Sequence, residues 1–127
     1  MKKNDFIFNA ELEHYCLTTS DYEVVINEED MSDEILKFAE SVVTAYPQKI
    51  IDIAHYIAKG LDTEEMFGVA ENEIPEKLHE PTIRIFSWDG IFDGVITYCN
   101  HKLDETHLID VEFSGVLEKF DSVGIDG

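Results

Sequence analysis

Four side chains suited to metal or nucleophilic chemistry fall within nine residues, in the stretch CNHKLDETH at positions 99–107. Cys99 and His101 share one face if the chain is extended here, and a loop would return Asp104 and His107 towards them. Zinc accepts such ligands, and a cysteine beside a histidine is the arrangement of a nucleophile with its base. One functional hypothesis is therefore a small metal-dependent or Cys/His hydrolase.

The same stretch has a simpler explanation as a strand, a polar loop and a second strand. No second CxxC or HxxxH element accompanies it, and isolated Cys and His residues are weak evidence for a metal. No oxyanion motif or helix N-terminus that would activate the cysteine is apparent. We therefore predict no catalytic residue, no metal and no cofactor.

A second candidate for acid–base chemistry lies in IDIAHYIAK, where Asp52 and His55 are three residues apart at helical spacing. Such a pair would serve as a general base, although a histidine at the boundary of a packed helix explains the pattern better. The chain has no EF-hand loop, P-loop, GxGxxG or GxSxG motif, so calcium, nucleotide and serine-hydrolase sites of those types are not indicated.

Charge is the most unusual property of the sequence. Nine basic residues against 28 acidic ones give a net charge of −19. Nucleic acids and anionic membranes require cationic contacts, so we expect neither as a partner. A basic protein surface is favoured instead, because opposite charge accelerates encounter and discourages other partners.

The acidic residues concentrate in two segments. Residues 28–34 hold five acids and no base, and residues 62–80 hold seven acids and one lysine. The simple interpretation is a solvated helix start and a solvated loop, with the apolar residues of the second segment covering the core. Alternatively, both segments form one negative surface around an apolar anchor, as a site for a basic protein would. The predicted partner-binding residues are Glu28, Glu29, Asp30, Glu64, Glu65, Met66, Phe67, Glu71 and Glu73.

The elements around these segments follow from hydrophobic periodicity. Strands are expected at 14–18, 22–26, 82–88, 95–99, 107–113 and 117–125, with a short lead-in at 5–8. Helical spacing predicts one helix that begins after Ser32 or Asp30 and a second that begins at Pro47 and ends at Gly60. Strands, then helices, then strands indicate a single α+β domain over 1–127. We expect an antiparallel sheet of about five to six strands with two main helices on one face.

Local signals leave the position of one hairpin turn undecided. Both Asp89-Gly90 and Asp93-Gly94 would suit a tight hairpin, and the sequence does not choose between them. Near the end of the chain, Phe120 is out of step with Val123 and Ile125, which indicates a β-bulge.

The first residues of the sequence, its lack of long apolar runs and its two cysteines suggest a compartment. The start, MKKNDFIFNAELE, lacks the apolar run of a secretory signal, and no stretch approaches 18 apolar residues. Cys16 and Cys99 are far apart and suit reduced thiols in a cytoplasm, although two adjacent strands would allow a disulfide between them. We expect a cytoplasmic protein.

The layout of paired strands, a helical middle and the closing run HLIDVEFSGVLEKFDSVGIDG resembles small acidic bacterial domains of unknown function. Some of these are assigned by context as immunity proteins of polymorphic toxin systems. The resemblance covers most of the chain in layout and implies a non-enzymatic protein that masks a basic partner. It carries over no catalytic or binding residue.

Overall fold

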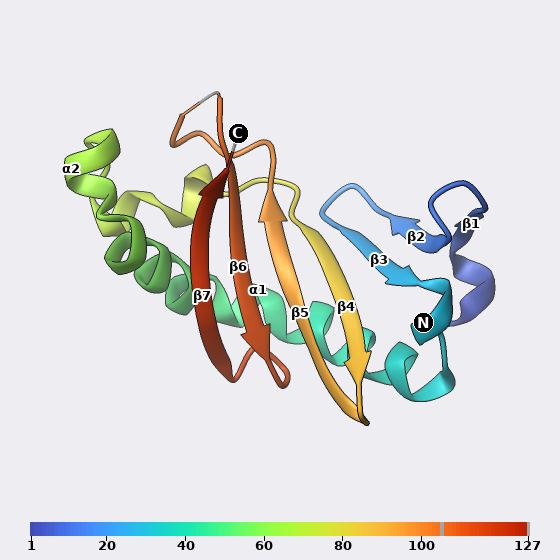
Figure 1. Cartoon of the computed structure of the whole chain (residues 1–127). Helices are drawn as coiled ribbons and strands as arrows, with labels where there is room; N and C mark the ends of the chain where they lie inside the picture. Colours follow the sequence, from blue (N-terminus) through green and yellow to red (C-terminus); the bar gives the residue numbers. More distant parts are fainter. Residues whose placement is uncertain (105, 127) are drawn as a thin grey trace.

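The computed structural model describes residues 1–104 and 106–126, which form one seven-stranded sheet and one long helix (Figure 1). The strands lie in the order of the sequence, and all neighbours are antiparallel except β3 and β4. This one parallel pair arises because the long helix connects β3 to β4 across the sheet. The strands are β1 (Ile7–Asn9), β2 (His14–Thr18), β3 (Glu23–Asn27), β4 (Thr82–Trp88), β5 (Ile91–Tyr98), β6 (Leu108–Ser114) and β7 (Lys119–Asp126).

The predicted α+β class with a mostly antiparallel sheet is confirmed, but two counts were wrong. The sheet has seven strands rather than five to six, because the short lead-in segment pairs with β2 as β1. One main helix, α1 (Asp33–Leu61), replaces the expected two. The other helical segments are short: α2 (Thr63–Phe67), and the 3₁₀ turns η1 (Lys3–Asp5), η2 (Glu28–Asp30), η3 (Glu71–Glu73) and η4 (Pro75–Lys77).

Helix α1 begins where the sequence indicated and continues through the expected break. The Ser32 hydroxyl accepts a hydrogen bond from the Ile35 N–H at 3.1 Å, as an N-cap should. Pro47 lies inside the helix, and its ring is exposed. The helix continues because the apolar stripes before and after Pro47 pack against the same sheet, and this packing outweighs the local cost.

The core lies between α1 and one face of the sheet. Alternate residues of the central strands point towards the helix, for example Val24, Ile83 and Ile96, and each is fully buried. Burial of such a side chain contributes roughly 1.5–3 kcal/mol. At Gly60, which was expected to terminate the helix, a Cβ would collide with Val123 of β7. This glycine allows the end of α1 to approach the sheet, and the helix ends at Leu61 instead.

The hairpin between β4 and β5 turns at Asp89-Gly90. Both residues have positive φ, 51° and 76°, which is the conformation of the turn that matches strand twist. Gly94 instead lies within β5, where a Cβ would approach the carbonyl oxygen of Arg84 to 2.5 Å. The second Asp-Gly pair is therefore a close-packing position rather than a turn.

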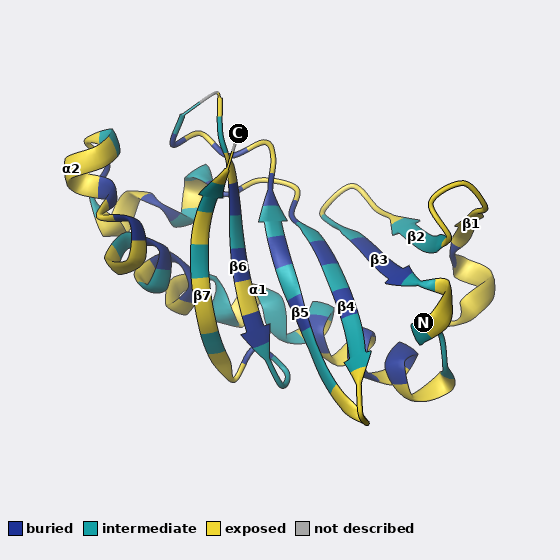
Figure 2. Ribbon diagram, viewed as in Figure 1, coloured by how far each residue is buried: buried dark blue, intermediate teal, exposed yellow. Residues whose placement is uncertain are grey.

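The opposite face of the sheet is not covered by any helix in Figure 1, and we call it the open face. It presents the alternate residues of each strand, which pair across the sheet as Cys16–Val25–Arg84–Val95–Glu112–Ser122 and Glu23–Thr82–Thr97–Asp110–Gly124. Most of these residues are half-buried or exposed, and this produces the alternating colours of the strands in Figure 2. None of the helices in the described part of the chain combines the length and apolar character that crossing a bilayer requires.

Candidate functional site

His101, the central member of the predicted catalytic or metal cluster, is buried and held by backbone groups. Its Nδ1 accepts from the N–H groups of Leu103 and Asp104 at 3.2 and 3.5 Å, so Nε2 carries the proton and donates to the His107 carbonyl at 2.6 Å. Both ring nitrogens are thereby occupied. His101 organises the β5–β6 loop and has no lone pair left for a metal or a substrate.

Asp104 and His107 form a close pair in the same loop. His107 Nδ1 lies 2.7 Å from Asp104 Oδ2, and the other oxygen of Asp104 accepts from the backbone N–H groups of Thr106 and His107, both at 3.0 Å. Desolvation opposes ionisation of Asp104, but the hydrogen bonds from His107 and Thr106 prevail and lower the pKa of Asp104 to about 2. The carboxylate closes the turn and orients the ring.

Cys99 is not joined to this pair. It is exposed, and within residues 1–104 and 106–126 no hydrogen bond connects it to His101 or His107. Among these residues, no three His, Cys, Asp or Glu side chains are arranged to hold a metal ion. Cys16 lies on β2, whereas Cys99 follows β5, so three strand spacings alone place them at least about 14 Å apart. That separation is too large for the disulfide considered from the sequence, and both thiols are free.

His55 pairs with a residue other than the expected Asp52. Its Nδ1 lies 2.8 Å from Glu71 Oε2, and both side chains are about half exposed. The contact ties α1 to η3, and an exposed ion pair of this kind contributes little to stability. The sequence could not identify it, because the two residues are 16 positions apart.

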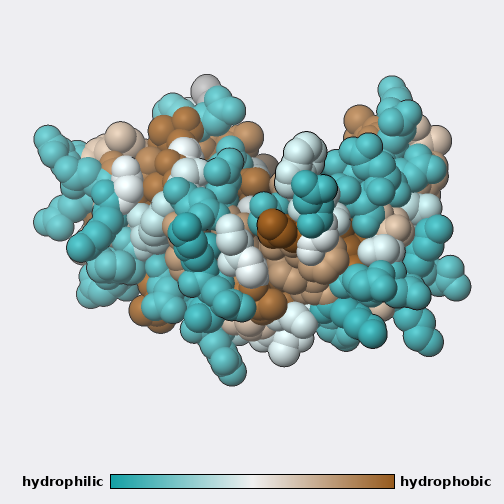
Figure 3. Space-filling view, turned by 60° about the horizontal axis from the view of Figure 1, so that its bottom comes forward, coloured by the Kyte–Doolittle hydropathy of each residue, from teal (hydrophilic) through white to brown (hydrophobic). Residues whose placement is uncertain are grey.

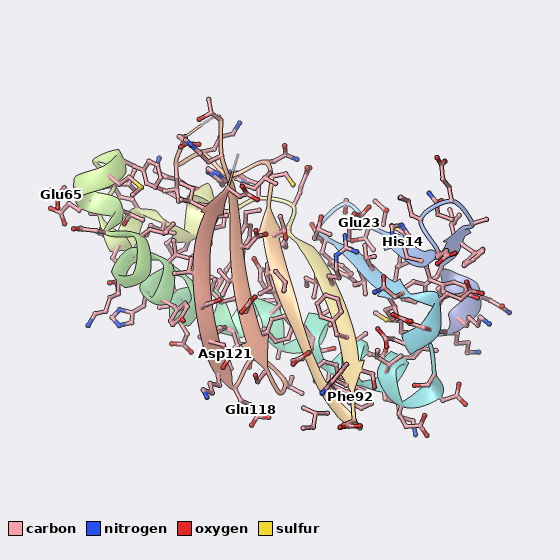
Figure 4. All side chains as sticks on the ribbon, in the orientation of Figure 1. His14, Glu23, Glu65, Phe92, Glu118 and Asp121 are labelled. Carbon is pink, nitrogen blue, oxygen red and sulfur yellow. The ribbon has the colours of Figure 1, made fainter. Side chains whose placement is uncertain are left out.

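The predicted partner-binding residues of the two acidic segments lie towards opposite ends of α1, so the expectation that they form one negative surface was wrong. Glu28, Glu29 and Asp30 form η2 immediately before the helix, and α2 follows its end. A helix of 29 residues separates them by roughly 43 Å. Glu65 accordingly lies at the far left of the molecule in Figure 4, away from Glu23 and His14.

The predicted apolar residues of the second segment differ in burial. Met66 is exposed, whereas Phe67 packs partly against the core. Val69 and Ile74 are buried, as the simpler interpretation expected. Glu73 accepts a hydrogen bond from the Ala70 N–H at 3.2 Å, so it caps a local turn.

An exposed apolar pair that the sequence analysis missed lies at the tip of the β4–β5 hairpin, on the open face. Trp88 is 76 % exposed, and Ile91, its partner across the two strands, is 62 % exposed. Phe86 lies one step further on the same face. We call Trp88 and Ile91 the apolar tip. Choosing Asp89-Gly90 as the turn would have identified the pair, because that turn places the two residues opposite each other.

Carboxylates adjoin the apolar tip on the same face. Asp93 pairs with Ser114 of β6, and the carboxylates of Glu112 and Asp121 lie near enough to act on it. Asp121 occupies the β6–β7 bulge that the sequence predicted. Desolvation, followed by repulsion from Asp121 and Glu112, raises the pKa of Asp93. We call these three residues the acidic cluster.

Hydroxyl groups hold two members of the acidic cluster in position. Ser122 Oγ donates to Glu112 at 2.7 Å, and Ser114 Oγ donates to Asp121 at 2.6 Å. Arg84, the single arginine of the sequence, lies on the same face. In the described residues, the one ion pair within 4.0 Å that involves Arg84 or the acidic cluster is Lys119–Asp121, at 3.6 Å. The face therefore combines fixed negative charge with an exposed aromatic anchor.

Asp30 is the one predicted partner-binding residue that the structure links to this face. Desolvation and the neighbouring Glu29 raise the pKa of Asp30, and a hydrogen bond from the backbone of Ser87 opposes them. Because Ser87 directly precedes Trp88, η2 lies beside the hairpin end. The space-filling view in Figure 3 shows hydrophilic surface over most of the visible face, interrupted by separate hydrophobic patches.

Comparison of the sequence with protein-family models and curated proteins, and of the structure with solved structures, finds no match.

Proposed function

We propose that the protein is a non-enzymatic interaction domain that masks a basic surface of a protein partner, in the manner of an immunity protein. The observation that carries this proposal is the juxtaposition of the apolar tip with the acidic cluster on one uncovered sheet face. Tryptophan is among the residues that most often dominate binding energy at interfaces.

Three physical terms support this assignment. Burial of Trp88 against a partner supplies hydrophobic energy. Two of the three carboxylates, Glu112 and Asp121, are already oriented by serine hydroxyl groups, so they lose little side-chain entropy on binding a lysine or arginine. The net charge of −19 attracts a cationic surface over several ångströms, which accelerates association.

A hydrolase that uses residues 99–107 is supported less well. The Asp104–His107 contact resembles the pairing that orients a general base. However, its carboxylate also closes a local turn, and Cys99 is hydrogen-bonded to neither histidine of the stretch in the described chain. The structural role explains these contacts without a reaction.

The test begins with recovery of a partner from the source lysate on the immobilised protein, and the evidence comes from the purified complex. We expect the association rate constant to fall at least tenfold between 50 and 500 mM NaCl. Trp88→Ser and Ile91→Ser should each raise Kd at least tenfold, which corresponds to about 1.4 kcal/mol. The matched control is Ile51→Ser, because Ile51 on α1 is 64 % exposed, like Ile91, but lies outside the open face.

The proposal fails if the association rate is indifferent to salt. It fails equally if the Ile51 and Ile91 variants weaken binding to the same extent, or if the recovered partner has no basic surface.

A further inference from the structure

β7 is the longer of the two free edges of the sheet. β1, at the other edge, has three residues, whereas β7 has eight and, among the strands of the described chain, pairs with β6 alone. An edge strand presents backbone N–H and C=O groups that another strand can use. The length of β7 makes it the better template for an added strand.

The first half of β7 contains features that discourage pairing with a further strand, and the second half does not. Lys119 and the bulge at Asp121 interrupt the beginning of the strand, and both features oppose edge-to-edge association. Residues 122–126 contain no proline, lysine or bulge. Val123 packs directly against Gly60 of α1, so the helix holds this half of the strand in place.

A gap in the side chains of β7 exposes an acidic residue of β6. Gly124 pairs with Asp110 across the two strands, and a Cβ at Gly124 would meet nothing within 4 Å. The Thr97 hydroxyl donates to Asp110 at 2.6 Å and fixes its carboxylate. A long basic side chain lying across Gly124 would therefore reach Asp110 from the outer edge, with Glu112 next to it on the open face.

We infer that β7 binds an extended segment of the partner that carries lysine or arginine at alternate positions, and that this segment adds an eighth strand to the sheet. Backbone hydrogen bonds supply affinity in this mode of binding, and alternate side chains supply specificity. Because strand side chains repeat every two residues, the basic side chains all reach the open face. This inference rests on the proposed function, since it names the form in which a basic partner meets the acidic surface.

A second copy of the protein suits this edge less well. Two chains of charge −19 repel each other, and pairing of two β7 strands would bring their carboxylates together. A cationic segment removes this repulsion.

The test uses the peptide acetyl-(Lys-Val)₄-amide as probe, with the full-length protein labelled with ¹⁵N. We expect binding that protects backbone amides of residues 122–126 from hydrogen exchange. The block peptide acetyl-Lys₄-Val₄-amide and a peptide N-methylated at alternate amides should bind at least tenfold more weakly. Both keep the charge but lose the alternation or the backbone donors.

Gly124→Lys should raise the Kd of the alternating peptide at least tenfold, because it fills the gap and adds a repelling charge. The open space at this position preserves folding. The matched control is Gln48→Lys, which makes the same charge change on the exposed side of α1 and should leave Kd within threefold.

Equal binding of the alternating, block and N-methylated peptides would overturn the strand-addition inference while leaving an acidic docking face in place. No detectable binding at millimolar peptide, protection confined to the β4–β5 hairpin, or a dimer that Gly124→Lys dissolves would also overturn it. Failure of the proposed function is a separate result, because that proposal depends on Trp88, Ile91 and salt in the complex with the protein partner.

Discussion

Removal of one hydroxyl group from either of two contacting tyrosines should give unequal losses of stability. The phenol oxygens of Tyr46 in α1 and Tyr98 in β5 lie 2.5 Å apart. Tyr98 is completely buried, whereas Tyr46 lines an open cavity of about 650 Å³ between α1 and the loops at one end of the sheet. The distance alone allows either oxygen to be the donor. Because Tyr46 borders the cavity and can direct its own proton to solvent there, we assign Tyr98 as the donor to Tyr46.

The magnitudes follow from which oxygen each change leaves without a partner. Tyr98→Phe removes the buried hydroxyl group itself, and Tyr46 can bond to water instead, so the cost is one net hydrogen bond, about 0.5–1.5 kcal/mol. Tyr46→Phe leaves the Tyr98 hydroxyl group buried and unsatisfied, which costs about 1–3 kcal/mol. The change at the more exposed residue is therefore expected to be the more damaging one, by about 1 kcal/mol.

Urea unfolding followed by far-ultraviolet circular dichroism would measure this difference. With a slope of roughly 2 kcal/mol per molar urea, the midpoints of the two variants should differ by about 0.5 M. The double variant should be more stable than Tyr46→Phe alone, because it contains no buried hydroxyl group without a hydrogen-bond partner. A loss for Tyr98→Phe equal to or larger than that for Tyr46→Phe would refute the reasoning.

Three further changes test other features of the fold. Gly94→Ala should destabilise by about 1–3 kcal/mol, because its Cβ would lie 2.5 Å from the Arg84 carbonyl oxygen, whereas Gly124→Ala, in open space, should preserve the melting temperature. Asp93→Asn should raise the free energy of unfolding by a few tenths of a kcal/mol at pH 7, because the raised pKa of Asp93 means that its charged form opposes folding. This gain in stability should vanish below pH 3.8, where the carboxyl group is protonated. If the variant were still more stable by the same amount there, this cause would be contradicted. Burial raises the pKa of Tyr46 to about 12. The stability that its neutral form contributes is therefore complete below pH 10 and should decline as pH rises from 10 towards 12. Urea midpoints at pH 8, 10 and 11 would measure this decline, and equal midpoints would exclude it.

Local chemistry could be predicted where a short segment decides its own structure. The Ser32 cap, the bulge near Phe120 and the alternation of β6 all follow from neighbouring residues, and the structure contains them. The prediction failed at Pro47, where propensity favoured a break but packing of both helical stripes against one sheet preserved a single helix. The candidate site failed for a related reason: His101 belongs to a chemically suggestive stretch, yet its nitrogens are used by backbone groups of its own loop.

The sequence by itself determined the α+β class, the mostly antiparallel sheet and the strong negative charge, because composition and hydrophobic period are properties of the chain alone. Only the tertiary structure decided where that charge is placed. Folding set the predicted partner-binding acids of the two segments towards opposite ends of α1, and it gathered Trp88, Asp93 and Glu112 on one uncovered face. These residues are joined by strand pairing, and the pairing partners of a strand depend on the whole sheet rather than on any local pattern.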